Sequence, residues 1–340
     1  MKKFKNILKN NNPFVIAELG AKYGDIKIIK KLIIDLKKSG ADAVKIQTFK
    51  AKNLVDSKSV FYPNNKKVNQ YKFFLKNQLS ENDHDKIIKL CKKINIDWFS
   101  TPANFEDIDY LEKFNPIAYK IGSDDLTNLP LIEYASKTNR AIILSTGMST
   151  MSEIKDAVKT IEKTKNKNIF ILHCISDYPS KEENANLNII KTLQKKFKYP
   201  IGLSDHTNND MTSIIATSMG AKIIEKHVMP NKAKNWSDAE SSLSLDDFTK
   251  LIDRVKKVKY VFGSSVRKVF ASEKKWKIKA NKSLYLSRDI KKNEVLTSDH
   301  ILIRRPAGKT KPINYYKFIN KKVYKNLKKN TNLTFDLINE

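Results

Sequence analysis

Short apolar, β-branched runs alternate with longer segments of helical periodicity along most of this chain, and the alternation repeats eight times. Helical patterns such as those of residues 26–38 and 151–163 separate the runs. This order favours a parallel sheet, and eight such units close into a (β/α)8 TIM barrel. The predicted strands are Phe14–Leu19, Ala43–Thr48, Asp97–Thr101, Ala118–Gly122, Ala141–Thr146, Ile169–Cys174, Ile201–Ser204 and Lys222–His227.

The length of 340 residues exceeds the about 250 residues of an ordinary barrel, so a second domain is expected. We predict a barrel domain over residues 1–265, a Lys-rich linker over 266–280 and a small, mostly β domain over 281–340. Strand-like runs at 283–286 and 301–304 support the last assignment. The predicted fold class is therefore an α/β barrel followed by a small β module.

The formal net charge of +29 raises the alternative of a basic nucleic-acid-binding protein on a barrel scaffold. Phe73, Phe74 and Trp98 could stack on bases, although aromatic residues in such patterns more often belong to a core. The positive charge is mainly lysine spread over the whole chain, and arginine, which binds phosphates and bases in a bidentate manner, is scarce. We expect solvated helix faces and no nucleic-acid partner.

Two cysteines, Cys91 and Cys174, form neither a disulfide framework nor a CxxC pair. The basic first residues lack the apolar region of a signal peptide, and no segment reaches the roughly 18 apolar residues of a membrane span. These features predict a cytoplasmic protein with no membrane partner.

Barrel enzymes carry their active sites at the C-terminal ends of the strands, and every predicted strand here delivers polar residues to that end. Insertions at 50–79 and 229–245 follow strands two and eight and are expected to be active-site loops. The polar residues at the strand ends are Glu18, Lys45, Gln47, Ser100, Thr101, Lys120, Ser123, Asp125, Ser145, Thr146, His173, Ser176, Ser204, Asp205, His206, Glu225 and His227.

Lys45 and Lys120 lie inside apolar runs, where an ammonium without an anionic partner would be costly to bury. Two interpretations stay open for each lysine. It could be neutralised by Glu18 or Glu225 in a salt-bridged core, or it could bind a phosphate or carboxylate. A bound anion would accept further hydrogen bonds from the hydroxyls of four serines, Ser123, Ser145, Ser176 and Ser204.

Three of the five histidines fall at the C-terminal ends of predicted strands. His206 and His227 end adjacent strands and could bind one divalent ion such as Mn²⁺ or Zn²⁺ together with oxygen atoms of a substrate. For His173 we expect a packing or orienting role instead.

Several segments, in this order and spacing, resemble the N-acetylneuraminate (sialic acid) synthases and their pseudaminic and legionaminic acid relatives. They are Ile16–Gly20, Gly40–Phe49, Ser100–Pro102, Lys120–Ser123, Leu126–Pro130, Leu144–Met148, His173–Cys174, Tyr178–Pro179, Ser204–Thr207 and Ile224–His227. The resemblance implies an enzyme that condenses phosphoenolpyruvate with an N-acylated amino-sugar aldehyde and water. The products would be a nonulosonic acid and phosphate, and the acceptor would be N-acetylmannosamine or a 6-deoxy diacetamido hexose.

The resemblance also implies roles for individual residues. His206 and His227 would hold the metal, with Mn²⁺ expected and Mg²⁺ or Co²⁺ as alternatives. The catalytic residues would be Glu18, Lys45, Lys120 and Asp125, and the substrate would be bound by Gln47, Ser123, Ser145, Ser176, Tyr178, Ser204, Asp238 and Arg305.

The tail, with Asp289–Val295 and Arg304–Pro306, is similar to the antifreeze-like (SAF) domain of this family. The resemblance implies a domain-swapped homodimer in which Arg305 reaches the sugar bound by the partner. The chain departs from the family at Ala21–Asp25, at Asp124 and at Asn235–Asp238, all on the sugar side. The nearest alternative is an enzyme of the same chemistry, a 3-deoxy-2-keto acid synthase that uses a phosphorylated sugar; the antifreeze-like module and the scattered arginines argue against it.

Overall fold

Eight parallel strands form a closed barrel in the computed structural model, which describes residues 12–21, 25–61, 67–231, 233, 236 and 238–339. Consecutive barrel strands pair in chain order, and β1 pairs with β10 to close the sheet. A short strand, β11 (Leu243–Ser244), extends one side of β10. The barrel strands are β1 (Phe14–Glu18), β2 (Ala43–Thr48), β5 (Asp97–Pro102), β6 (Ala118–Ile121), β7 (Ala141–Ser145), β8 (Ile169–Cys174), β9 (Ile201–Asp205) and β10 (Ile223–Met229). The predicted barrel is confirmed, and each observed strand end lies within two residues of its prediction.

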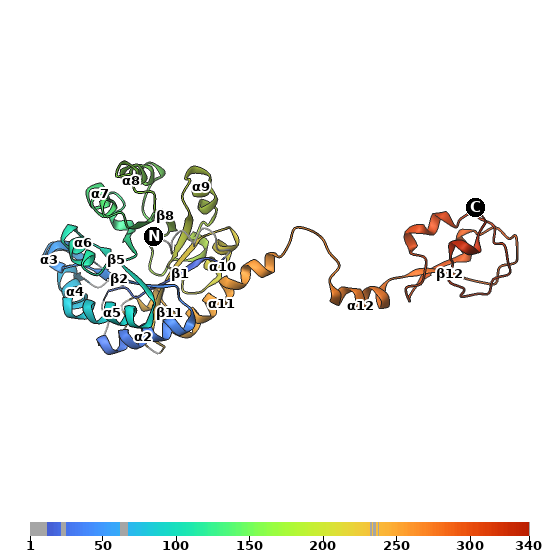
Figure 1. Ribbon diagram of the computed structural model, residues 1–340, viewed down its shortest axis with the longest axis horizontal. Helices are drawn as coiled ribbons and strands as arrows, with labels where there is room; N and C mark the ends of the chain where they lie inside the picture. The colour runs from blue at the N-terminus through green and yellow to red at the C-terminus, as the bar shows by residue number, and fades with distance from the viewer. Residues whose placement is uncertain are drawn as a thin grey trace. The chain divides into compact units, whose positions relative to one another are not determined.

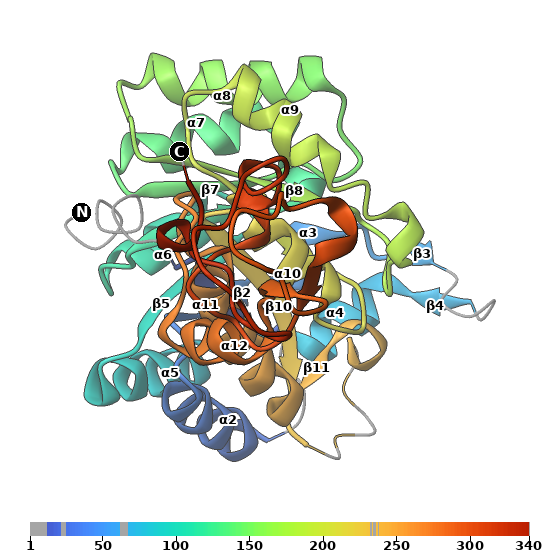
Figure 2. The same ribbon diagram turned by 90° about the vertical axis from the view of Figure 1, so that its right-hand side faces the viewer.

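Helices surround the strands (Figure 1), with α7, α8 and α9 along one side of the barrel and α2 and α5 along the opposite side (Figure 2). Local sequence signals set their ends: Asp25 caps the start of α2, Gly40 ends it at φ 87°, and Thr150 and Glu153 form a capping box at α8. The helices are α2 (Ile26–Ser39), α5 (Glu81–Ile94), α6 (Phe105–Glu112), α7 (Leu129–Lys137), α8 (Met151–Lys163), α9 (Asn188–Lys196), α10 (Met211–Ser218) and α11 (Leu245–Phe262).

The strands bury both of their faces, and each face has its own hydrophobic core. The larger core lies between strands and helices and includes Leu36, Ile224 and Val228. The smaller core, with Phe99 and Phe170 among its members, fills the barrel interior. Because the interior is packed with apolar side chains there, polar inward-facing residues are confined to the C-terminal ends of the strands.

The insertion after β2 folds into two short helices and a hairpin: α3 (Ala51–Leu54), β3 (Val60–Phe61), β4 (Val68–Asn69) and α4 (Gln70–Asn77). The rings of Phe73 and Phe74 contact each other edge to face at 5.4 Å, and Phe74 also contacts Phe49 at 5.5 Å. Trp98 is buried in the main core. These aromatic residues therefore pack within the protein rather than forming a platform for bases.

The chain divides into two compact units, residues 1–263 and 264–340. The second unit contains the antiparallel pair β12 (Ser283–Leu286) and β13 (Ile301–Arg304), with 3₁₀ turns and isolated bridges around a small core of its own. Within the segment predicted as a linker, the structure adds a helix, α12 (Ala271–Ala280), none of whose residues is buried.

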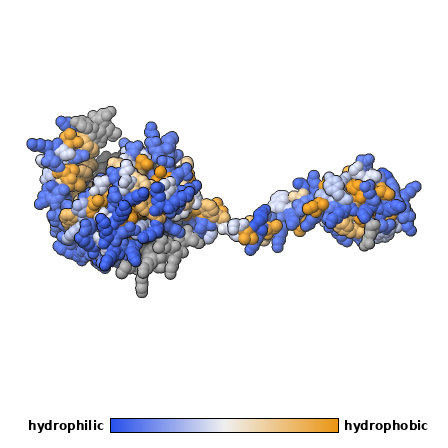
Figure 3. All heavy atoms as spheres, turned by 90° about the horizontal axis from the view of Figure 1, so that it is seen from above, coloured by the Kyte–Doolittle hydropathy of each residue, from blue (hydrophilic) through white to orange (hydrophobic). Residues whose placement is uncertain are grey.

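The visible face of the barrel is largely hydrophilic (Figure 3), in keeping with lysines on solvated helix faces. In the described part of the chain, no helix is both long and apolar enough to cross a membrane. The first eleven residues, on which the signal-peptide prediction depends, lie outside the described ranges.

We predict that Phe99→Ala destabilises the barrel by about 3–5 kcal/mol, because the fully buried ring fills the barrel interior and its loss leaves a cavity. Urea unfolding followed by circular dichroism measures the change. The control is Phe105→Ala on α6, whose side chain is 43% exposed and should cost no more than about 1 kcal/mol. Equal losses in the two variants would contradict the assigned interior packing.

Candidate functional site

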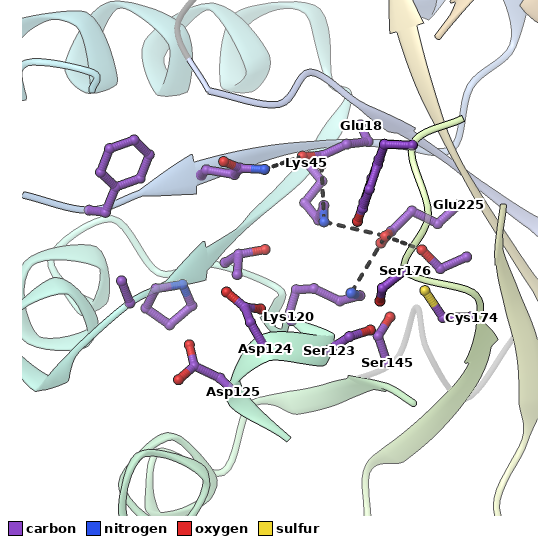
Figure 4. A pocket seen from close by; sticks show the side chains of 18 of the residues that line it. Glu18, Lys45, Lys120, Ser123, Asp124, Asp125, Ser145, Cys174, Ser176 and Glu225 are labelled. Atoms are coloured by element: carbon purple, nitrogen blue, oxygen red, sulfur yellow. Dashed lines mark hydrogen bonds and ion pairs between the residues drawn. The ribbon is translucent and has the colours of Figure 1, made fainter. Parts of the chain in front are cut away.

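A cavity of about 510 Å³ opens at the C-terminal ends of the barrel strands (Figure 4). The structure brings most of the predicted site residues together around it. Those lining the cavity are Glu18, Lys45, Gln47, Lys120, Ser123, Asp125, Ser145, Ser176, Tyr178, Ser204, His206 and His227. Asp238 lies beside it, with Oδ2 3.8 Å from Nδ1 of His227. Arg305 belongs to the second unit, where its Nε donates to the carbonyl of Ala280 at 2.8 Å, so its predicted role stays a prediction.

Four buried charges occupy the floor of the cavity. Lys45 contacts both Glu18, at 3.1 Å, and Glu225, at 3.3 Å. Among the carboxylates of the described residues, Lys120 contacts only Glu225, at 3.5 Å, and it also donates to the carbonyl of Ile121 at 3.5 Å. All the contacts of Glu225 converge on Oε1, which also accepts a hydrogen bond from Ser204 at 3.0 Å. Its other oxygen, Oε2, has no hydrogen-bond partner among the described residues.

The two lysines differ in how well they are compensated. Burial by itself would lower the pKa of Lys45, but the two carboxylates outweigh it and raise that pKa above its ordinary value. Burial also lowers the pKa of Lys120, and there the single carboxylate does not restore it. Lys45 is thus neutralised within the protein, whereas Lys120 is left short of negative charge. Of the two interpretations left open above, the salt-bridged core fits Lys45, and an anion site fits Lys120.

Hydroxyl groups without partners surround the Lys120 side of the cavity. Oγ of Ser145, Oγ of Ser176 and Oγ1 of Thr101 are buried and have no hydrogen-bond partner among the described residues. Ser123 accepts a hydrogen bond from the backbone N–H of Gly147 at 3.0 Å. Buried donors of this kind are costly unless a ligand uses them, so the set forms a cradle for an anion.

Gly147 leaves the space that this cradle needs. A Cβ at this position would overlap the hydroxyls of Ser176 and Ser123. The glycine is therefore explained by the open space above the serines, which a phosphate oxygen could enter.

His206 and His227 lie on one wall of the cavity with their ring centroids 5.5 Å apart. Nδ1 of His206 donates to the carbonyl of Ile175 at 2.8 Å, an arrangement that leaves the lone pair of Nε2 available. Burial and the neighbouring His206 and Lys45 hold the pKa of His227 well below its usual value, so its ring is neutral. With the lone pair of His206 Nε2 available and the ring of His227 neutral, the two imidazoles suit a divalent transition metal.

No group of three or more His, Cys, Asp or Glu side chains arranged for a metal ion occurs in the described part of the chain. The two histidines would therefore need further oxygen ligands from substrate or water. The ring of Tyr178 stacks on His206 with centroids 4.1 Å apart and limits the space on that side.

Several residues that line the cavity were not predicted as site residues, among them Cys174 and Asp124. Cys174 ends β8 and places Sγ 3.8 Å from Nδ1 of His206; burial raises the pKa of a thiol, but the contact with His206 outweighs it and lowers the pKa of Cys174 to about 7. Asp124 also lines the cavity, and its carboxylate occupies the space that a side chain at Gly122 would fill. The position of Cys174 at a strand end was a usable signal, whereas the orientation of Asp124 depends on the 3₁₀ turn at Ser123–Asp125.

Two of the segments in which the chain departs from the family lie only partly within the described residues. Residues 22–24 of the Ala21–Asp25 segment, and 235 and 237 of the Asn235–Asp238 segment, lie outside the described residues.

We predict that Gly147→Ala weakens binding of inorganic phosphate at least about tenfold, a loss of about 1.4 kcal/mol, because the added methyl group displaces the hydroxyls of the cradle. Isothermal titration calorimetry measures the affinity. The melting temperature should change little, since serine hydroxyls can rotate away from the methyl group. Unaltered phosphate affinity in a folded variant would show that the anion binds elsewhere.

We also predict that Glu225→Gln destabilises the barrel by about 3 kcal/mol at pH 7, because it leaves two buried ammonium groups with less compensation. Burial raises the pKa of Glu225, but Lys120 and Lys45 outweigh it and lower the pKa to about 2. The carboxylate therefore stabilises the fold above its unfolded-state pKa of about 4.3 and loses that contribution as the pH falls toward 2.

Urea unfolding of wild type and Glu225→Gln should thus converge between about pH 4.3 and pH 2. Ser204→Ala, which removes a single hydrogen bond to the same oxygen, is the control and should cost about 1 kcal/mol. A constant difference between wild type and Glu225→Gln across this pH range would refute the charge assignment.

Comparison with known proteins finds relatives that match most of the chain. The N,N'-diacetyllegionaminic acid synthase of Campylobacter jejuni is 35% identical over 322 residues, which cover 92% of this chain and 96% of that protein. The pseudaminic acid synthase of Helicobacter pylori is 33% identical over 330 residues, 95% of this chain and 97% of that protein. The crystal structure of the N-acetylneuraminic acid (sialic acid) synthetase from Leptospira borgpetersenii in complex with citrate superposes with a TM-score of 0.69 at 30% identity. It covers 78% of this chain and 91% of that one.

Family models match both units of the chain. The model of the NeuB family matches residues 32–267, and the model of the SAF domain matches residues 281–339. The resemblance inferred from the motifs is confirmed by these matches: the chain belongs to the NeuB family and carries a SAF domain after its barrel.

Proposed function

We propose that the protein condenses phosphoenolpyruvate with the open-chain aldehyde of an N-acylated amino sugar, with water as the third reactant, to form a nonulosonic acid and phosphate. The observation that carries this proposal is one cavity that combines an under-compensated lysine, buried hydroxyls without partners among the described residues and two adjacent histidines. The lysine and the hydroxyls would bind an anionic donor, and the two histidines would bind a metal ion that polarises a carbonyl acceptor beside it.

Phosphoenolpyruvate would supply the negative charge that Lys120 lacks. Its phosphate would take hydrogen bonds from the cradle of Ser123, Ser145 and Ser176 beside Gly147. These groups would also stabilise the phosphate as it leaves, since donors aimed at developing charge in a buried site contribute several kcal/mol to a reaction.

His206 and His227 would hold a divalent ion, for which we propose Mn²⁺ with Mg²⁺ or Co²⁺ as alternatives. Such an ion would act as a Lewis acid on the aldehyde oxygen of the sugar. The protein's part is to orient both rings, which the Ile175 carbonyl does for His206.

Glu18 would orient the water that adds to C2 of the former phosphoenolpyruvate after its C3 has attacked the aldehyde carbon. Oε1 of Glu18 accepts hydrogen bonds from the backbone N–H of Gly20 at 3.0 Å and from Gln47 at 3.1 Å, while Oε2 faces Lys45. Burial raises the pKa of Glu18, and Lys45 opposes that rise. A carboxylate so held can take a proton from water as phosphate leaves by C–O cleavage.

The sugar would lie toward Tyr178, Asp125 and Asp238. Legionaminic and pseudaminic acid synthases are among the similar proteins, which favours a diacetamido sugar as much as N-acetylmannosamine. The domain-swapped homodimer, the role of Arg305 in it and a cytoplasmic location stay predictions.

A phosphate-release assay tests the proposal. Phosphoenolpyruvate and Mn²⁺ are combined with N-acetylmannosamine, with diacetamido 6-deoxy hexoses, or with a phosphorylated hexose as the rival acceptor. We expect acceptor-dependent phosphate release with at least one unphosphorylated N-acylated sugar. Release only with the phosphorylated sugar would favour the 3-deoxy-2-keto acid synthase instead.

In the same assay we predict that His206→Ala and His227→Ala each lower metal-dependent release at least about 100-fold without unfolding the barrel, because a Lewis acid contributes several kcal/mol. His84→Gln is the control, since His84 is a buried histidine whose Nε2 contacts Thr48 outside the cavity. Undiminished turnover in both variants, after metal stripping and add-back, would refute the ligand assignment.

A further inference from the structure

A buried ion pair lies directly behind the two histidines. Asp205, the last residue of β9, is the ladder partner of Lys226 in β10. Nζ of Lys226 lies 2.9 Å from Oδ2 of Asp205, and the two residues are 0% and 3% exposed, respectively. In the chain, Asp205 precedes His206 and Lys226 precedes His227.

The pair faces away from the cavity. Successive residues of a strand point to opposite faces, and Glu225 points into the cavity (Figure 4), so Lys226 points outward. Its neighbours on the same face, Ile224 and Val228, belong to the core between strands and helices. The pair therefore cannot touch a substrate in the barrel mouth.

The carboxylate of Asp205 is saturated with hydrogen bonds. Oδ2 accepts from the hydroxyls of Thr212 and Ser213, both at 2.6 Å, in addition to Lys226. Oδ1 accepts from the backbone N–H and the hydroxyl of Thr207, at 2.9 and 2.8 Å. Lys226 also donates to the hydroxyl of Thr207 at 3.0 Å. One side chain thus joins the end of β9, the middle of β10 and the first turn of α10.

Stability alone does not account for such an arrangement. Replacing a buried ion pair by apolar side chains of similar volume is often neutral or stabilising, because both charges must be desolvated. What the saturated pair provides is a defined position for the backbone at 205 and 226. The rings of His206 and His227 make fewer polar contacts than this carboxylate: the Ile175 carbonyl at 2.8 Å and Cys174 Sγ at 3.8 Å for one, Asp238 at 3.8 Å for the other. The ring of Tyr178 lies beside both.

We propose that Asp205 and Lys226 are positioning residues that set the spacing and orientation of His206 and His227 for a divalent metal. The inference rests on the metal site of the proposed function and extends it to two residues that touch neither metal nor substrate. Substitution of outer residues that orient metal-binding histidines typically lowers metal affinity about 10- to 100-fold.

The test is a titration of metal-free protein with Mn²⁺, in which electron paramagnetic resonance measures the free ion. The variant Asp205→Asn/Lys226→Met removes both charges and nearly preserves the volume of each side chain. We expect its Mn²⁺ affinity to fall about 10- to 100-fold. The affinity for phosphoenolpyruvate, measured without metal, should stay within about twofold, since the Lys120 cradle is untouched.

A matched control is Glu112→Gln/Arg140→Met. Arg140 binds Glu112 through two hydrogen bonds, of 3.1 and 3.0 Å, and this pair lies at the N-terminal end of the barrel near the start of β7. It loses the same charges in the same way, so its Mn²⁺ affinity should equal that of the wild type. The side chains of Arg140 and Glu112 are 27% and 32% exposed, so an equal fall in this control would show a general effect of neutralising an ion pair and would overturn the proposal.

The possible outcomes separate the inference from the proposed function. Wild-type Mn²⁺ affinity in Asp205→Asn/Lys226→Met would overturn the positioning role, whereas wild-type affinity in His206→Ala would overturn the metal site itself. If the double variant does not fold, Thr212→Ala/Ser213→Ala removes two donors to Asp205 and keeps the ion pair. We then expect at least about a threefold loss of Mn²⁺ affinity, against no change if the network is only structural.

Discussion

Closure of the sheet between β1 and β10 is the constraint on which the site depends. It places Glu18 opposite His227 in the ladder, and it brings Lys45 within 3.3 Å of Glu225, 180 positions away in the chain. Neither lysine could be buried in a barrel that failed to close, because their compensating carboxylates come from the first and last strands. The charged floor of the cavity and the closed barrel therefore require each other.

The cavity divides into regions with different chemistry. The Lys120 side is short of negative charge and offers hydroxyls without partners among the described residues, whereas the histidine wall is partly covered by Tyr178. The outer part toward Asp124 and Asp125 is acidic. An anionic donor, a polarised carbonyl and a hydroxyl-rich sugar are complementary to these three regions in turn. The Asp205–Lys226 pair extends the histidine wall into the layer between strands and helices, so in the proposed metal site the placement of the two rings would depend on how β9, β10 and α10 are joined.

Much of the fold and the membership of the site could be predicted from local patterns. Apolar β-branched runs separated by amphipathic helices define a barrel, because each unit must bury one helix stripe against a strand buried on both faces. Once the barrel is assumed, strand-end residues such as Glu18 and His227 must meet. The ends of the helices are likewise set by residues close in sequence, as the capping box at Thr150 and the glycine after α2 show.

The sequence by itself determined that this chain forms an eight-stranded barrel and a small second unit, and that lysines, serines and two histidines share one mouth. Only the tertiary structure decided which of those groups pair with one another and which are left without a partner among the described residues. It pairs Lys45 with two carboxylates and Lys120 with one, turns Asp124 against Gly122, and opens the space above Gly147. It also surrounds the carboxylate of Asp205, behind the histidines, with hydrogen-bond donors. The physical reason is that charge compensation and hydrogen bonding depend on distances of a few ångströms between residues far apart in the chain, whereas periodicity records only which face a residue occupies.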